Sequence, residues 1–343
     1  MKIKKNKIAI VILNWNGKKY LEKFLPSVVK HSHSDETKIY VADNGSTDDS
    51  VAFVKNTFPQ IELILLGQNY GFTGGYNKAL QEIDAKYFVL LNSDAEVTEN
   101  WINPLISLMD NDESIAAAMP KILAYNNKNQ FEYAGASGGF IDKYAYPFCR
   151  GRIIGTIEKD VGQYDKISEI FWASGAAMFI RANLYKEAGG LDNDFFAHME
   201  EIDLCWRLKN MGFKIIVNPN SVVYHVGGGT LPNNSSKKIF LNYRNNLLLL
   251  LKNLPKNKII PVVFSRLILD GLSGFIYLVS LKFSFFFAVI KAHFCFYVSI
   301  PKTMKKRNNI NVKKQKHKEI YEKSIVFNYF VKNKKTFNKL NFK

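Results

Sequence analysis

Short apolar runs recur at regular intervals along the first 120 residues. Each run has the length of a buried strand, and together they cover residues 8–13, 38–42, 61–66, 87–91 and 115–119. Between these runs, apolar side chains return at the three- and four-residue spacing of an amphipathic helix, as at Leu21, Leu25 and Val28. Strands that alternate with helices are typical of a parallel sheet covered on both faces. We therefore expect an α/β fold with a doubly wound, mostly parallel sheet and helices on both of its faces.

The pattern is less regular in the middle of the chain. Residues 98–110 have the spacing of a further helix, but periodicity fades between residues 121 and 167. This predicts a long excursion without regular elements. Apolar spacing returns in a helix that begins near Glu200, and in strands at residues 214–217 and 221–224.

The last third of the chain is strongly apolar and then basic. An amphipathic helix is predicted at residues 240–254, and apolar stretches follow at residues 259–281 and 283–300. The ionisable residues that interrupt these stretches are Arg266, Asp270, Lys282, Lys291 and His293. Each charge would cost roughly 2.5–3.5 kcal/mol at the centre of a bilayer. Helices that lie in the membrane interface are therefore favoured over a spanning hairpin or a buried soluble subdomain.

The distribution of charge supports the same division. The net charge is +17, and residues 302–343 hold fourteen Lys and Arg against two Glu, which is +12 of that total. A basic tail after apolar helices fits an anionic membrane surface, and no nucleic-acid partner is expected. We expect an α/β domain at residues 1–235, membrane-associated helices at 236–300 and a basic tail at 301–343. Membrane contact would involve residues 259–343.

Polar side chains suited to ligand binding follow three of the predicted strands. Asn14 follows the first, Asp43 the second, and the triplet Asn92-Ser93-Asp94 the fourth. In open α/β sheets, ligands bind outside the carboxyl ends of the strands, so one crevice would bring these residues together. A carboxylate there suits Mg²⁺ or Mn²⁺ that also binds phosphate oxygens. For each residue taken alone, a solvated turn is the alternative.

Two other segments have features suited to phosphate. The glycine-rich segment 69–77 opens a predicted helix, where free N–H groups and a close backbone approach favour an anion. An ordinary loop before a helix is the alternative. Arg150 and Arg152 lie in the middle of the excursion, either as bidentate pyrophosphate ligands or as solvated surface residues.

An acidic cluster opens the helix that is predicted near residue 200. Glu200, Glu201 and Asp203 either complement the helix dipole or include a general base that faces the crevice. His225 follows a predicted strand and precedes three glycines. A lone histidine is more often structural, but one at a strand end is well placed to ligate a metal.

Together these motifs resemble a known family. The matching segments are residues 11–17, 41–48, 69–77, 90–94, 200–207 and 224–228. In their order and spacing they resemble the family 2 glycosyltransferases of the GT-A fold, in the rhamnosyltransferase-like branch that builds bacterial surface polysaccharides. The resemblance covers about residues 8–230.

The resemblance implies roles at the strand ends. Asp43 is similar to the acid that accepts a hydrogen bond from the pyrimidine ring of the donor nucleotide, and Asn14 to the residue beside that base. Asp94 resembles the metal-binding end of an Asp-x-Asp motif, whose first position holds Asn92 here. His225 resembles a second metal ligand. Metal binding would then depend on a single carboxylate.

The resemblance also implies a reaction. Glu201 occupies the position of the family's catalytic Asp, with Glu200 as an alternative base and Asp203 beside them. The base would take a proton from an acceptor hydroxyl, which displaces the nucleoside diphosphate with inversion. The residues expected to contact the donor are Asn14, Asn16, Asp43, Asn44, Asn69, Gly71, Gly74, Gly75, Asn77, Asn92 and Arg152.

The implied function is metal-dependent sugar transfer with Mn²⁺ or Mg²⁺. The donor would be dTDP-rhamnose or a UDP-sugar, and the acceptor a saccharide or a lipid-linked saccharide. A sugar nucleotidyltransferase is disfavoured, because Asn14-Trp15-Asn16 replaces a basic, glycine-rich loop after the first strand. A non-catalytic nucleotide-sugar-binding protein is the other alternative. Three widely spaced cysteines favour a reducing environment, so we expect the protein at the cytoplasmic face of the bacterial inner membrane.

Overall fold

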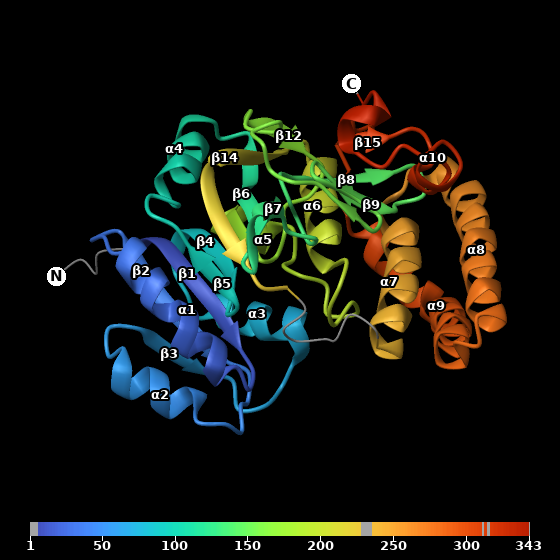
Figure 1. Ribbon diagram of the computed structural model, residues 1–343. Helices are drawn as coiled ribbons and strands as arrows, with labels where there is room; N and C mark the ends of the chain where they lie inside the picture. Colours follow the sequence, from blue (N-terminus) through green and yellow to red (C-terminus); the bar gives the residue numbers. More distant parts are fainter. Residues whose placement is uncertain (1–5, 228–234, 311, 314–315, 343) are drawn as a thin grey trace.

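The central layer of the protein is a mixed sheet (Figure 1). This computed structural model describes residues 6–227, 235–310, 312–313 and 316–342. Within them, four strands pair in parallel in the order β3-β2-β1-β4. These strands are β1 (Asn6–Asn14), β2 (Thr37–Asp43), β3 (Glu62–Leu65) and β4 (Ala85–Asn92). They correspond to the first four predicted strands, and their parallel pairing agrees with the predicted fold class.

Beyond β4 the sheet contains both strand directions. Its order continues β4-β13-β6-β14-β12, with β13 antiparallel to β4 and β6, and β14 parallel to β6. These strands are β6 (Ile115–Ala124), β12 (Ser168–Ile170), β13 (Ala177–Arg181) and β14 (Lys214–His225). Two short strands, β5 (Ala95–Val97) and β7 (Asn127–Phe131), pair with β14 and β6.

Helices cover both faces of this sheet, as predicted. One face carries α1 (Lys18–His31), α2 (Ser50–Thr57) and α4 (Asn103–Asn111). The other carries α3 (Gly71–Gln81), α5 (Ala182–Glu187) and α6 (Glu200–Asn210). Successive side chains of a strand point to opposite faces. Ile10 of β1 therefore packs under α1, α2 and α4, and Val11 packs on the opposite face, under α3, α5 and α6.

Two predicted boundaries are wrong. The helix predicted at residues 98–110 begins at Asn103, where Pro104 fits the first helical turn because a proline there loses no intrahelical hydrogen bond. The strands predicted at residues 214–217 and 221–224 form one strand, β14. Its register against β6 shifts between Asn218 and Val222, so the strand bends without ending.

The predicted excursion at residues 121–167 contains a second sheet, which corrects the expectation of an irregular segment. Its strand order is β11-β10-β9-β8-β15. The strands are β8 (Gly139–Asp142), β9 (Pro147–Cys149), β10 (Arg152–Ile153), β11 (Thr156–Ile157) and β15 (Ile320–Tyr321). Because β15 pairs with β8, the C-terminal residues fold back onto the α/β domain.

Three long helices lie side by side at one end of the molecule (Figure 1). They are α7 (Ser236–Asn253), α8 (Lys256–Val279) and α9 (Phe283–Asn308). The leucines of α7 at 247–251 are buried, so this helix packs on the α/β domain as predicted. By length and composition, α8 and α9 are each apolar enough to cross a membrane. Two short helices, α10 (Ile325–Phe330) and η1 (Phe337–Leu340), follow them.

Candidate active site

The ends of β1 and β2 bring Asn14 and Asp43 side by side. The two residues are paired in register, and Asn14 Nδ2 donates to Asp43 Oδ1 at 3.1 Å. Asp43 Oδ2 accepts from Ser46 N at 2.9 Å. Asn14 is buried, and its Oδ1 meets no hydrogen-bond partner in the described residues. A carboxylate is thus held in one orientation beside an unused buried acceptor.

Three asparagines hold the loops around this pair. Asn16 has a left-handed φ of 50°, and its Oδ1 accepts from Thr47 N at 2.7 Å. Asn44 Nδ2 donates to Asn69 Oδ1 at 3.2 Å and to Gly71 O at 3.0 Å. These bonds connect the loop after β2 to the loop before α3. Asn16, Asn44 and Asn69 therefore hold together the loops at the strand ends with their side chains.

The glycines of α3 permit close approach. Gly71 has a φ of 71°, and a Cβ there would lie 2.6 Å from the ring of Phe196. A Cβ on Gly75 would lie 2.8 Å from Leu13 Cδ1, so this glycine lets α3 pack tightly on β1. A Cβ on Gly74 would lie 3.0 Å from Tyr70 Cβ. Only small residues therefore fit along this edge of α3.

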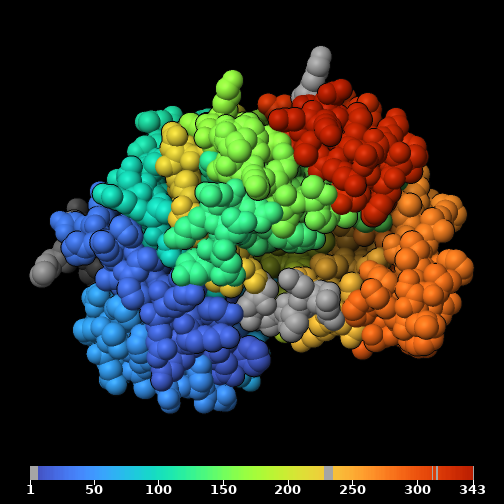
Figure 2. All heavy atoms as spheres, viewed as in Figure 1, coloured from blue at the N-terminus to red at the C-terminus, as the bar shows by residue number. Residues whose placement is uncertain are grey.

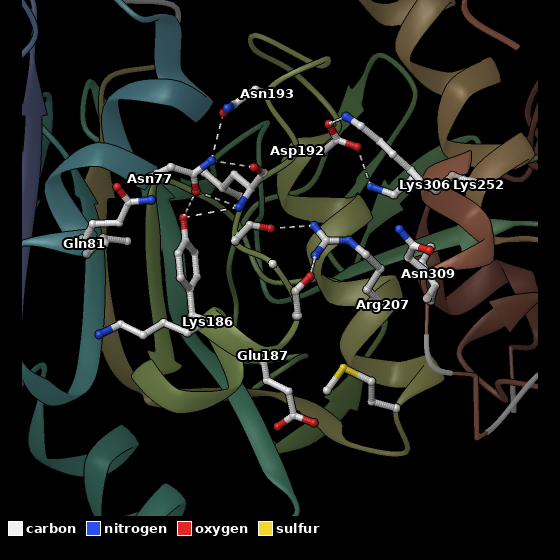
Figure 3. A pocket seen from close by; sticks show the side chains of 18 residues that line it. Asn77, Gln81, Lys186, Glu187, Asp192, Asn193, Arg207, Lys252, Lys306 and Asn309 are labelled. Atoms are coloured by element: carbon white, nitrogen blue, oxygen red, sulfur yellow. Dashed lines mark hydrogen bonds and ion pairs between the residues drawn. The ribbon is translucent and has the colours of Figure 1, made fainter. Parts of the chain in front are cut away.

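Asn77 is directed away from the strand ends. Its Nδ2 donates to Leu191 O at 2.7 Å, and its Oδ1 accepts from Tyr185 Oη at 2.6 Å. Asn77 thereby ties α3 to the loop after α5 and lines a separate cavity of about 850 Å³ (Figure 3). Charged pairs such as Lys306 with Asp192 surround that cavity. The structure gives Asn77 a bracing position rather than one beside Asp43.

Asp94 and His225 form a charged pair at the end of β4. His225 Nε2 lies 3.0 Å from Asp94 Oδ1 and 3.1 Å from Asn92 Nδ2. The pairing of β5 with β14 produces this contact between residues more than 130 positions apart. Burial alone would lower the pKa of His225, but the Asp94 carboxylate outweighs it and raises that pKa to about 10. The Asp94 carboxylate thus favours positive charge at the position where a cation would bind.

Glu132 is a residue of this site that the sequence analysis missed. Its Oε1 lies 3.5 Å from His225 Nδ1, on the opposite side of the imidazole from Asp94. Its other oxygen accepts a hydrogen bond from Ala134 N. A carboxylate behind a histidine fixes the ring and leaves Nε2 for a metal. Glu132 lies in a segment without periodicity, so the sequence held no signal for it.

The donor set at this point fits a divalent cation with few protein ligands. In the described part of the chain there is no group of three or more His, Cys, Asp or Glu that could hold a metal by itself. Asp94 and His225 present one oxygen and one nitrogen, 3.0 Å apart. Mg²⁺ and Mn²⁺ accept such a partial set when substrate oxygens and water complete it.

Glu200 and Glu201 lie in the first turn of α6, directly after the N-cap residue Met199. Each has one buried carboxylate oxygen without a hydrogen-bond partner among the described residues. Burial raises the pKa of Glu201 to about 7, and burial together with Glu201 raises that of Glu200. Glu200 is buried, whereas Glu201 is partly exposed. Glu201 is therefore the more exposed of two residues whose carboxyl pKa values are raised, although its Oε2 is buried.

Asp203 does not share this environment. Its carboxylate is fully buried, 2.7 Å from Arg207 Nη2 and 2.9 Å from Lys252 Nζ, and it accepts from Asn253 Nδ2 at 2.8 Å. These cations outweigh burial and lower its pKa. The expectation of a catalytic Asp203 is corrected, because both of its oxygens are engaged in holding α6 against α7.

Arg152 is also placed differently from its prediction. Its guanidinium is buried in the second sheet and donates to Tyr133 O and Pro147 O, both at 3.0 Å, and to Cys149 Sγ at 3.5 Å. These contacts use one N–H on each nitrogen, and burial keeps the two remaining N–H donors away from a ligand in the strand-end crevice. Arg152 instead braces the strand connection next to Glu132.

Two curated relatives are rhamnosyltransferases. Rhamnosyltransferase WbbL of Escherichia coli (strain K12) is 23% identical over 219 residues, which are 61% of this chain and 79% of that protein. N-acetylglucosaminyl-diphospho-decaprenol L-rhamnosyltransferase of Mycobacterium tuberculosis (strain ATCC 25618 / H37Rv) is 22% identical over 240 residues, 64% of this chain and 75% of that protein.

Solved structures share the fold. GalNAc-T7 with UDP, GalNAc and Mn²⁺ matches with a TM-score of 0.55 at 15% identity, over 73% of this chain and 48% of that one. This chain thus spans about half the length of GalNAc-T7. Staphylococcus aureus TarS 1–349 matches with a TM-score of 0.51 at 14% identity, over 76% and 71% of the two chains. These likenesses support a fold of the GT-A type.

A family model defines the relationship more closely. The model described as glycosyl transferase family 2 matches residues 9–180, from β1 to β13. The matched residues are half of the chain and include the strand-end groups Asn14, Asp43 and Asp94. The chain is therefore a glycosyltransferase that belongs to glycosyl transferase family 2.

Proposed function

We propose that this glycosyltransferase moves a sugar, with inversion, from a nucleotide-diphosphate sugar to a saccharide or lipid-linked acceptor in cell-surface polysaccharide synthesis. One observation carries the proposal. Asn14, Asp43 and Asn92 meet at the neighbouring ends of β1, β2 and β4, and the pair of Asp94 and His225 lies beside them. Ligands of open α/β sheets bind at this edge.

Asp43 is the residue that we assign to the base of the donor. Asn14 and Ser46 fix the orientation of its carboxylate before a nucleotide arrives. Each carboxylate oxygen has a second lone pair, which can accept from the ring N–H of a pyrimidine. Asn44 and Asn69 contribute by holding the loop that would enclose the nucleotide.

Asp94 and His225 are the residues that we assign to Mn²⁺ or Mg²⁺. When bound, the ion would neutralise charge on the leaving nucleoside diphosphate. Glu132 and Asn92 orient the imidazole from its two sides. The chain supplies one carboxylate here, so the metal would depend on donor oxygens for the rest of its coordination.

Glu201 is our choice for the general base. A base that accepts a proton near neutral pH is well matched to an acceptor hydroxyl, and the pKa of Glu201 is raised to about 7. Its partial exposure allows an acceptor to reach it, whereas Glu200 is buried beside it. Glu200 remains the alternative base.

The relatives guide the choice of substrates. Both compared relatives are rhamnosyltransferases by name, and the mycobacterial name includes a diphospho-decaprenol carrier. We therefore place dTDP-rhamnose first among donors, with UDP-sugars next. A saccharide on a diphospho-lipid is the first acceptor to test.

The apolar side chains of α8 and α9 support association of the enzyme with a membrane interface. Exposed apolar side chains follow one face of α8 and continue along α9: Ile260, Phe264, Ile268, Leu272, Ile276, Phe283, Phe287, Ile290, Phe294 and Val298. The buried charges of α8 face the protein, where Arg266 Nε lies 2.7 Å from Asp270 Oδ1. Such a one-sided helix pair suits insertion into one leaflet. We place the enzyme at the cytoplasmic face of the inner membrane.

A donor panel tests this function. The purified full chain is incubated with dTDP-rhamnose and UDP-sugars, with Mn²⁺, Mg²⁺ or EDTA, and released nucleoside diphosphate is measured. We expect release from one donor class only when metal is present, and faster release when a lipid-linked saccharide is added. Binding of UDP or dTDP without release from any donor would identify a non-catalytic binding protein instead.

A further inference from the structure

The segment before α6 has an unusual backbone. Phe196, His198 and Met199 have φ values of 63°, 69° and 72°, in the left-handed region that non-glycine residues rarely adopt. Such conformations persist only where surrounding contacts impose them. Met199 is the N-cap residue directly before α6, so its backbone angles direct the turn that carries Glu200 and Glu201. Whatever holds this segment therefore sets the direction of the proposed base.

The side chain of Asn245 on α7 holds the segment. Its Nδ2 lies within hydrogen-bonding distance of three carbonyl oxygens, those of Phe195 at 2.9 Å, Ala197 at 2.9 Å and His198 at 2.8 Å. Its Oδ1 accepts from Arg244 Nε at 2.9 Å. Asn245 is fully buried. Three carbonyls on one side and a guanidinium on the other leave the amide a single favourable orientation.

The same segment also touches the donor side of the site. Phe72 N, at the start of α3, donates to Phe196 O at 3.1 Å. The Phe196 ring packs so closely on Gly71 that a Cβ on this glycine would lie 2.6 Å from the ring. One short segment thus contacts the loop assigned to the donor and begins the helix assigned to the base. Its conformation fixes the relative position of the two.

We propose that Asn245 is a positioning residue for sugar transfer, which holds residues 195–199 in the conformation that sets the proposed base against the donor loop. The inference rests on the proposed function, because it takes Glu201 or Glu200 as the base. Asn245 acts through the backbone of this segment and does not touch substrate. It follows that α7, which packs along α9, is part of the catalytic framework.

The chain provides a matched control at the next position. Asn246 is as fully buried as Asn245 and lies on the same helix. Its Nδ2 donates to Ala145 O at 2.7 Å, and its Oδ1 accepts from Arg266 Nη1 at 2.7 Å. Asn246 therefore anchors a different segment. Asn245→Ala and Asn246→Ala each remove one buried amide, but only the first releases the segment before α6.

The test compares the full-length protein with these two variants. Turnover of the donor found in the panel gives kcat and KM, and hydrogen exchange followed by mass spectrometry reports on residues 195–201. For Asn245→Ala we expect kcat to fall at least tenfold, donor KM to change less than threefold, the acid limb of the pH profile to move, and exchange to accelerate in this segment. For Asn246→Ala we expect kcat within threefold of the unaltered protein.

A second variant covers the case in which Asn245→Ala does not fold. Arg244→Met removes the guanidinium that orients Asn245 and that itself donates to Phe195 O at 3.2 Å, but it keeps the amide of Asn245. We expect a smaller loss of kcat with the same faster exchange at residues 195–201. Equal kcat in the Asn245 and Asn246 variants, or unchanged exchange in this segment, would overturn the positioning role. Absence of turnover by the unaltered protein would overturn the proposed function, so the two failures are distinguishable.

Discussion

At the scale of single residues, the pair of Asp94 and His225 supports the sharpest prediction. Asp94→Asn keeps the size of the side chain and removes its charge. Metal-dependent donor turnover should fall about 100-fold or more, because charge stabilisation by a metal is worth several kcal/mol. The pKa of His225, about 10 with both carboxylates in place, should fall, since Asp94 raises it more than Glu132 does. Turnover assays and NMR titration of the imidazole measure the two effects.

A matched carboxylate provides the control for Asp94. Asp165→Asn removes a charge from a half-exposed side chain that pairs with Lys121, away from the strand ends. This variant should keep its turnover. Full activity of Asp94→Asn in the presence of EDTA would exclude Asp94 from the mechanism.

Glu201 supports a prediction about pH. A general base works only when unprotonated, and the pKa of Glu201 is raised to about 7. Turnover should therefore fall about tenfold for each pH unit below 7 and level off above it. Glu201→Gln should lower turnover by about 10²–10⁴-fold and abolish this limb. Glu200→Gln should still show the fall in turnover below pH 7. If Glu201→Gln shows this fall and Glu200→Gln does not, Glu200 is the base.

Some residues of the site could be predicted from sequence and others could not. Asn14, Asp43 and Asp94 directly follow apolar runs, and the ends of parallel strands necessarily meet at one edge. Asp203 and Arg152 have structural partners that no local pattern indicated: Lys252 and Asn253 lie 49 and 50 positions from Asp203, and Tyr133 lies 19 positions from Arg152. A charged side chain next to a site binds whichever group the fold brings to it, and here those groups are Lys252 and backbone carbonyls.

At the scale of elements, the contact of α3 with β1 depends on Gly75. A Cβ at this position would lie 2.8 Å from Leu13 Cδ1 and 3.1 Å from Asn44 Nδ2. Gly75→Ala should therefore destabilise the protein by about 1–3 kcal/mol, as overpacking does. Because Asn44 holds the donor loop, nucleotide binding should weaken as well. Urea unfolding and calorimetry with UDP or dTDP measure these effects.

Gly271 provides the opposite case. It lies inside α8, and a Cβ there would meet no atom within 4 Å among the described residues. Gly271→Ala should leave nucleotide binding unchanged and raise stability by roughly 0.4–1 kcal/mol, because alanine loses less conformational freedom in a helix. A similar gain in stability from Gly75→Ala would show that α3 tolerates a side chain at Gly75.

Helices and strands were predictable where the sequence pattern that determines them lies within a short stretch of the chain. The alternation of strands and helices up to β4 follows from patterns within a dozen residues, and the structure contains all of those elements. The second sheet was missed because its strands are two to four residues long. Its β15 pairs with β8 across almost 180 positions, and no local period can indicate such a partner.

At the scale of the whole molecule, the C-terminal residues are more than a basic tail. Tyr321, Phe337 and Phe342 pack with Phe140 and Phe148 of the second sheet. Asp142 Oδ2 accepts from Ile325 N at 2.9 Å, which fixes α10 to the same sheet. The apolar face of α8 and α9 is therefore left as the main candidate for membrane contact. Figure 2 shows these helices on one side of the molecule.

The proposed membrane contact predicts which changes weaken binding to vesicles. Phe264→Glu with Phe294→Glu places two charges on the exposed apolar face, where these rings are 64% and 68% exposed. Because a charge opposes insertion into the interface, sedimentation with anionic vesicles should fall at least tenfold. Nucleotide binding should persist, since neither ring contacts the strand-end site. Val161→Glu, at a side chain 80% exposed on a distant loop, should sediment like the unaltered protein. Undiminished sedimentation of the double variant would assign the membrane contact to the lysines of the C-terminal segment instead. Binding that depends only on these lysines should be lost at high salt, because salt screens exposed charges.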